Sequence, residues 1–240
     1  MNMSAFLSAQ DGAEIVILTD GAGYKNDGTV VTLGSKVTVG KVAPIAVTTR
    51  GSHALGLAFQ ARICKAADVL GVDKALAIIE EEFPSLASDP KYNGLDCFHI
   101  HIAAYSESRG LIRLSGHNLP QAFTDGEEPG RLVVVDGTYT AGTPASKAMY
   151  AACGVTERRK GERLGDFLFR VGPNLMEAWR RTPAALMPGD DQDGPQYLIG
   201  GQCDFTLVTP DGAATATLKT WPDQIGEKID PFADARSVAA

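Results

Sequence analysis

Four residues in the first part of the chain carry groups suited to hydrolysis by a hydroxyl nucleophile. Ser4 supplies a hydroxyl, Asp20 follows the apolar run EIVILT, Lys36 opens the run KVTV, and Gly51 follows the run PIAVTTR. A serine hydroxyl is a weak nucleophile until a base removes its proton. A nearby lysine paired with an acid can set the charge of such a site, and a backbone N–H can stabilise an oxyanion. The pattern indicates a candidate hydrolytic site at the ends of strands.

Apolar runs rich in β-branched residues predict the strands that position these groups. The runs at 3–9 and 14–19 flank Asp11-Gly12, a typical hairpin turn. The second run is almost continuous in Ile, Val and Leu, which is typical of a strand buried on both faces. Further strands are expected at 29–33, 36–39, 44–49, 96–106, 111–116, 131–136, 197–209 and 213–220.

Helical periodicity appears in two places between the strand groups. A helix is expected at about 53–70, between Ser52 and Gly71, and a second at about 73–83, ended by Pro84. Later helices are expected at 145–152 and at 163–182, the last interrupted near Gly172-Pro173. Strand groups separated by helix pairs predict an α+β fold of antiparallel sheets with helices on their outer faces. We expect one domain over 1–240, with the tail from about 222 loosely attached.

Composition narrows the function classes. With 240 residues, of which 44% are hydrophobic and 21% charged, the chain can build a sizeable core. The net charge of −7 argues against a broad nucleic-acid surface. Four cysteines without paired spacing suggest reduced thiols. We see neither a signal peptide nor an apolar run long enough to span a bilayer, so we expect a cytoplasmic protein without membrane contact.

The element order and the first fifty residues together resemble the proteasome β-subunit and HslV group of N-terminal-nucleophile hydrolases. The matching pieces are the opening hairpin, Thr19-Asp20-Gly21, the element Gly34-Ser35-Lys36-Val37, and the run 47–52 that leads into a long helix. The separation 36 − 20 = 16 between the acid and the lysine is also similar to that family. None of these motifs is specific alone, and their order carries the resemblance.

The resemblance implies a four-layer αββα sandwich and a site without metal or cofactor. It makes Ser4 the candidate nucleophile, with its own free α-amine as the base after removal of Met1–Met3. It assigns Asp20 as the partner of the lysine, Lys36 as the electrostatic modulator and Gly51 as an oxyanion donor. The resemblance further implies a peptide or amide substrate. It also implies a homo-oligomer, for which the family offers a ring-type assembly. We expect Asp20 and Lys36 to lie within about 6 Å of each other.

Three other interpretations remain open. The chain could be a catalytically silent member of the fold that serves as a structural or binding subunit. Asp20 and Lys36 could be a turn-capping acid and a solvated lysine. Cys97, His99 and His101 alternate along one strand and could ligate zinc, with Cys203 or His117 nearby, although a packed strand face is the better interpretation.

Overall fold

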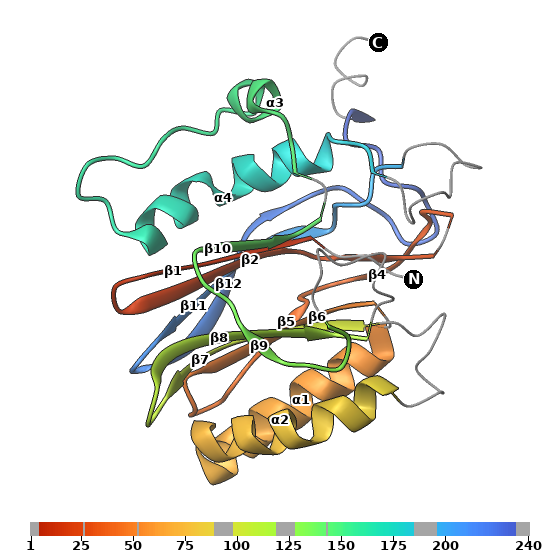
Figure 1. Cartoon of the computed structure of the whole chain (residues 1–240). Coiled ribbons are helices and arrows are strands. Elements are labelled where there is room, and N and C mark those ends of the chain that lie inside the picture. The colour runs from red at the N-terminus through yellow and green to blue at the C-terminus, as the bar shows by residue number, and fades with distance from the viewer. Residues whose placement is uncertain are drawn as a thin grey trace.

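The predicted strands and helices assemble into a mixed α/β fold with antiparallel sheets (Figure 1). The structure is a computed structural model that describes residues 5–25, 27–51, 53–88, 98–118, 128–142, 144–184 and 196–233. Ser4 and Cys97 therefore lie outside the described residues.

The first five-stranded sheet is built around the opening hairpin. Its order is β10-β1-β2-β11-β12, and all described pairings in it are antiparallel. The central strand β2 is buried along its whole length, as its continuous apolar sequence predicts. The strands are β1 (Phe6–Asp11), β2 (Glu14–Asp20), β10 (Thr138–Ala141), β11 (Gln202–Thr209) and β12 (Gly212–Thr220).

The second five-stranded sheet has the order β5-β6-β7-β8-β9 and is also antiparallel. Its strands are β5 (Val37–Val39), β6 (Ile45–Gly51), β7 (Phe98–Ser106), β8 (Gly110–His117) and β9 (Val133–Val134). A separate two-stranded sheet joins β3 (Ala22–Tyr24) to β4 (Val30–Leu33).

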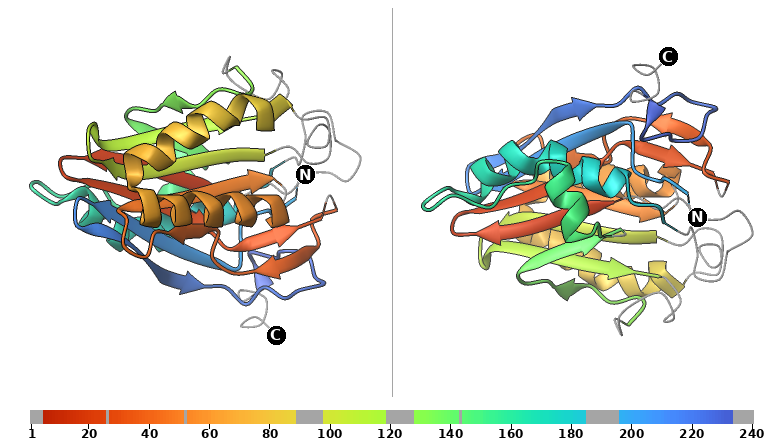
Figure 2. Two further views of the ribbon diagram at one scale, coloured as in Figure 1. Left: turned by 90° about the horizontal axis from the view of Figure 1, so that it is seen from below. Right: turned by 90° about the horizontal axis from the view of Figure 1, so that it is seen from above.

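Helices lie on the outer face of each large sheet (Figures 1 and 2). The first pair, α1 (His53–Leu70) and α2 (Val72–Ser88), packs on β6, β7 and β8 in one apolar cluster. The second pair, α3 (Lys147–Ala152) and α4 (Leu164–Arg180), packs on β1, β2 and β11. Along β2, Val16 and Leu18 face α4, whereas Ile15 and Ile17 meet Ala46 and Ala103 of the other sheet. This two-residue alternation brings the inner faces of the sheets together.

Two helices differ from their predicted ends. We expected Pro84 to end the second helix, but α2 continues through it to Ser88. Proline removes one backbone donor from a helix interior, yet Phe83 and Ala87 are both buried on the sheet side, and this packing keeps the helix intact. Likewise, α4 runs without a break through Gly172-Pro173, because its apolar face continues into Met176 and Trp179.

Several strands also differ from prediction. β9 has two residues, whereas the prediction ran from 131 to 136, and β3 and β10 were not predicted. β11 begins at Gln202 and not at 197, because Gly200 and Gly201 bond to Asp20 and Asp223 instead of a neighbouring strand.

The segment after β12 packs against the body, in contrast to the loose attachment expected from residue 222. Asp223 forms an ion pair with Arg180 of α4 at 2.6 Å, and both side chains are almost fully buried. The Arg180 guanidinium also lies over the Trp221 ring, and Ile229 packs on Ala22 and Val30. These contacts fix the segment up to residue 229.

Polar side chains occupy part of the layer between the sheets. His99 Nε2, Ser115 Oγ and Tyr139 OH form a closed set of hydrogen bonds of 2.6, 2.9 and 3.2 Å. His101 stacks on the Tyr139 ring, and neither of its ring nitrogens has a partner among the described residues. Burial lowers the pKa of His101 to about 3, with a smaller contribution from the Arg113 charge, and lowers the pKa of His99 well below its ordinary value.

These buried histidines predict acid-sensitive stability. The unfolded chain protonates each histidine near pH 6.5, whereas the folded chain does so only at much lower pH, so stability is complete above about pH 6.5 and falls below it. Each buried histidine contributes a loss of about 1.4 kcal/mol per pH unit.

The variant His101→Phe tests this directly by urea unfolding between pH 4.5 and 7.5. It keeps the stacked ring and removes two desolvated nitrogens, so we expect equal or greater stability at pH 7.5 and a flatter pH dependence than in the wild type. An unchanged pH slope in His101→Phe would contradict the interpretation.

Candidate functional site

The Asp20 carboxylate is the junction of the candidate site. It is fully buried at the end of β2 and receives four donors. Lys36 Nζ and the Ala5 N–H donate to Oδ1 at 2.8 and 3.0 Å. The N–H groups of Ala22 and Gly200 donate to Oδ2 at 3.3 and 3.4 Å. The predicted pairing of Asp20 with Lys36 is therefore present, in a buried position that excludes the solvated-lysine interpretation.

Lys36 is held in place through its backbone. It directly precedes β5, and its carbonyl accepts hydrogen bonds from Thr48 Oγ1 and Gln60 Nε2 at 3.0 and 3.1 Å. Gln60 comes from α1 and also bonds to the hydroxyls of Thr38 and Thr49. The helix thereby fixes the position from which Lys36 reaches across to the other sheet.

Burial acts in opposite directions on the two members of the pair. It raises the pKa of Asp20 above its ordinary value, and the Lys36 ammonium and the N–H groups of Ala5 and Ala22 oppose that rise. It lowers the pKa of Lys36, and the Asp20 carboxylate opposes this fall while the Arg50 charge adds to it. Lys36 therefore gives up its proton more readily than an exposed lysine does.

The turn after Asp20 depends on a close backbone approach at Gly21. A Cβ at this position would lie 2.5 Å from Gln202 Cγ and 3.0 Å from the Gly34 carbonyl oxygen. Gly21 N–H donates to the Gly200 carbonyl, and Gly34 N–H donates to the Gly21 carbonyl. The turn thus joins the loop before β11 to the segment that leads to Lys36.

Gly51 ends β6 with φ of +104°, a conformation that other residues rarely adopt. It pairs with Phe98 of β7, but the Phe98 N–H donates to Asn118 Oδ1 and the Phe98 carbonyl accepts from the Asn118 N–H, both on the other side of β7. Because successive residues of an antiparallel strand bond to alternate sides, the Gly51 N–H points away from β7, toward the edge where β5 and Lys36 lie.

Two further charged residues act on the pair. Arg50 lies on the β6 face directed between the sheets, is half-buried, and interacts electrostatically with both Asp20 and Lys36. Asp204 lies opposite Thr19 in the sheet, is held by Gln202 Nε2 and Thr217 Oγ1, and attracts the Lys36 ammonium. The site therefore combines two basic and two acidic side chains.

Of the four predicted residues, the structure brings Asp20 and Lys36 into contact. Gly51 lies at the end of β6, the strand beside β5. Ser4 lies outside the described residues, and Ala5, which follows it in the chain, bonds to Asp20. Gly200 and Gln60 were not predicted as part of the site. The doublet Gly200-Gly201 is visible in the sequence, whereas no local sequence signal marks Gln60, because its contacts depend on how α1 packs.

Metal binding finds no support among the described residues, where no group of three or more His, Cys, Asp or Glu side chains is arranged to hold an ion. His99 and His101 do share the inner face of β7, and His117 lies opposite His99, with ring centroids 6.4 Å apart. Cys203 belongs to the apolar cluster under α4, on the other side of its sheet. His99 and Ser115 bond to each other like a base and a nucleophile, but Ser115 is fully buried.

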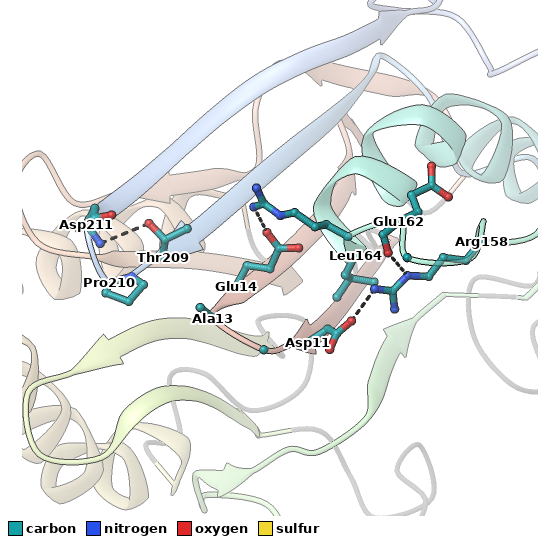
Figure 3. Close-up of a pocket in the computed structure, with 12 residues that line it drawn as sticks. Asp11, Ala13, Glu14, Arg158, Glu162, Leu164, Thr209, Pro210 and Asp211 are labelled. Carbon is teal, nitrogen blue, oxygen red and sulfur yellow. Dashed lines mark hydrogen bonds and ion pairs between the residues drawn. The ribbon is translucent and has the colours of Figure 1, made fainter.

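An open pocket of about 700 Å³ lies at the other end of β2 (Figure 3). Glu14 starts this strand and Asp20 ends it, so the pocket is about 20 Å from the Asp20–Lys36 pair. Its main charges are already paired, Arg158 with Asp11 at 2.6 Å and Arg163 with Glu14. We therefore place the candidate site at the Asp20 end.

Comparison of the sequence with protein-family models gave no match. No curated protein matched the sequence either. Among the described residues, none of the helices combines the length and apolar character needed to cross a membrane. The functional argument consequently depends on the geometry of the site.

The buried pair predicts strong energetic coupling between Asp20 and Lys36. Removing one partner leaves the other charge buried, so Asp20→Asn or Lys36→Met alone should each cost about 3–5 kcal/mol of unfolding free energy. The double variant, measured by denaturant unfolding at pH 7.5, should lose clearly less than the sum of the two. Additive losses within about 0.5 kcal/mol would show that the pair is not coupled.

Proposed function

We propose that the chain is an N-terminal-nucleophile hydrolase of the proteasome β-subunit type, with a four-layer αββα architecture and activity toward amide or peptide bonds. The observation that carries this proposal is the Asp20 carboxylate, which holds Lys36 and the Ala5 N–H on the same oxygen. A buried acid–lysine pair bonded to the residue next to Ser4 is the arrangement that such chemistry requires. The helix-covered sheets support the proposed architecture.

The proposed reaction begins with Ser4 as the first residue of the processed chain. Its hydroxyl attacks the substrate carbonyl carbon, and its α-amine takes the hydroxyl proton. The Gly51 N–H stabilises the oxyanion. The C–N bond then breaks, the α-amine returns the proton to the leaving amine, and water hydrolyses the Ser4 ester to release the acid product.

Lys36 and Asp20 act on this reaction through charge. A protonated lysine close to the α-amine keeps that amine neutral at neutral pH, so that it can accept a proton. Asp20 holds the lysine and the start of β1 in a fixed relation. The Thr48 and Gln60 bonds to the Lys36 carbonyl support this geometry from the second sheet and from α1.

A second function fits the same geometry if Met1–Met3 remain attached to Ser4. The chain would then be a silent structural or binding subunit, because an acylated Ser4 nitrogen cannot act as the base. The observation that favours this alternative is the dense bonding of Asp20, whose four donors also suit a purely structural role.

Intact-mass analysis combined with a serine-reactive phosphonate separates the two functions. We expect a chain that begins at Ser4 and gains one phosphonate, located on the N-terminal serine by peptide mapping. Lys36→Met should slow labelling by about 100-fold or more, and Ser4→Ala should abolish it. Ser35→Ala is the matched control, since this exposed serine adjoins Lys36 and should leave labelling unchanged.

Retention of Met1 together with absence of labelling would overturn the hydrolase and leave the silent subunit. Labelling that persists in Ser4→Ala but disappears in Ser35→Ala would place the nucleophile elsewhere and would also contradict the proposal.

A further inference from the structure

The strand β12 forms an edge of the first sheet that differs from the other sheet edges. The two five-stranded sheets end on β10 and β12 and on β5 and β9. β12 has nine residues, whereas β10, β5 and β9 have four, three and two. A long edge exposes a row of backbone groups that can pair with another strand, and native proteins usually shorten or block such edges. β12 runs along the rim of the molecule (Figure 2).

The register identifies the backbone groups that face outward. β11 and β12 are joined by a two-residue turn, so Thr209 and Gly212 form the closing hydrogen-bonded pair. Alternation along the ladder makes Thr206–Thr215 a pair without backbone hydrogen bonds, and their hydroxyls bond to each other at 2.8 Å. The N–H and C=O groups of Ala213, Thr215 and Thr217 therefore point away from β11.

Among the residues that the structure describes, this part of β12 lacks the usual protection of an edge. The run 212–218, GAATATL, contains no charge and no proline, and residues 214–217 are exposed. Phe169 of α4 is 52% exposed and packs edge-on against Phe205, the residue opposite Ala216. An exposed aromatic ring and two exposed alanines thus border the open edge. The pairing of β11 with β12 shifts register only next to Cys203 and Asp204, beyond the stretch 212–217, so no bulge interrupts this part of the edge.

We propose that β12 pairs with β12 of a second copy of this chain, antiparallel and about a two-fold axis at Thr215. Thr215 then faces Thr215 of the second copy, and Ala213 faces Thr217, so all outward groups meet partners in about six hydrogen bonds. A two-fold contact of one surface patch with itself closes as a dimer.

The charges at the two ends of β12 favour a second copy of this chain as the partner of the edge. Asp211 precedes the strand and Lys219 lies near its end, at equal distances in sequence from Thr215. Antiparallel pairing brings the acid of one copy next to the lysine of the other at both ends, with an uncharged stretch between them. Glu177 holds the Lys219 ammonium at 2.9 Å and so keeps it near that end. Within the paired run 211–219, no two like charges face each other.

Molar mass by light scattering over a range of concentrations tests the dimer on the full chain. We expect a dimer in the wild type and at least a 10-fold weaker association in Thr215→Pro. Proline removes an N–H that faces away from β11, so the β11–β12 ladder stays intact. Thr206→Val is the matched control, because it removes the same Thr206–Thr215 hydroxyl bond without altering the edge, and it should remain a dimer.

Hydrogen exchange of the unaltered protein gives a readout that needs no variant. In the dimer the amides of Ala213, Thr215 and Thr217 should exchange more slowly at high than at low protein concentration. A monomer at all concentrations up to about 100 µM would overturn the proposal. So would an oligomer in which these three amides exchange rapidly or in which Thr215→Pro has no effect. The proposal is independent of Ser4 chemistry, and loss of the dimer leaves the hydrolase assignment untouched.

Discussion

The buried carboxylate of Asp20 is the constraint on which the site depends. A carboxylate removed from water is costly unless it is paired and hydrogen-bonded, and Asp20 meets this requirement with one ammonium and three N–H groups. The donors come from the start of β1, the start of β3, the residue before β5 and the loop before β11. Segments as far apart in the sequence as Ala5 and Gly200 are thus held at one point at the end of β2.

This junction also explains why the surrounding backbone is so constrained. Gly21 can approach Gln202 closely because it has no side chain, and Gly200 bonds to Asp20 while the next residue, Gly201, bonds to Asp223. Asp223 in turn pairs with Arg180 of α4. A displacement of Asp223 would therefore move Gly201 and, through the next peptide group, the Gly200 N–H that bonds to Asp20. Among the described residues, the segment after β12 makes no direct hydrogen bond to the Asp20 carboxylate.

Local sequence patterns predicted much of the fold, and tertiary packing decided the rest. The hairpin at Asp11-Gly12, the buried strand β2 and the long helix α1 follow from turn chemistry and periodicity. Pro84 and Gly172-Pro173 predicted breaks that do not occur, because the apolar faces of α2 and α4 continue past them. β10 and the late start of β11 depend on partners far away in the chain, β1 and Asp20, which no local pattern reveals.

The same distinction applies to the site. Asp20 and Lys36 were predictable because each marks the end or start of a strand, and their pairing is present at 2.8 Å. The role of Gly51 stays a prediction. Gln60 and Gly200 were not, since their roles arise from the docking of α1 and of the loop before β11. Ser4 was predicted from the resemblance to N-terminal-nucleophile hydrolases, and its catalytic role is a proposal that the bond from Ala5 to Asp20 supports.

The most direct test of the central claim is a crystal structure of the protein after reaction with the serine-reactive phosphonate. The proposal predicts a chain that begins at Ser4, a phosphorus–oxygen bond to its Oγ, and a phosphonyl oxygen within about 3 Å of the Gly51 N–H. The Lys36 ammonium should remain on Asp20 beside the adduct. Unmodified Ser4 preceded by intact Met1–Met3, with the Asp20–Lys36 pair unchanged, would contradict the claim.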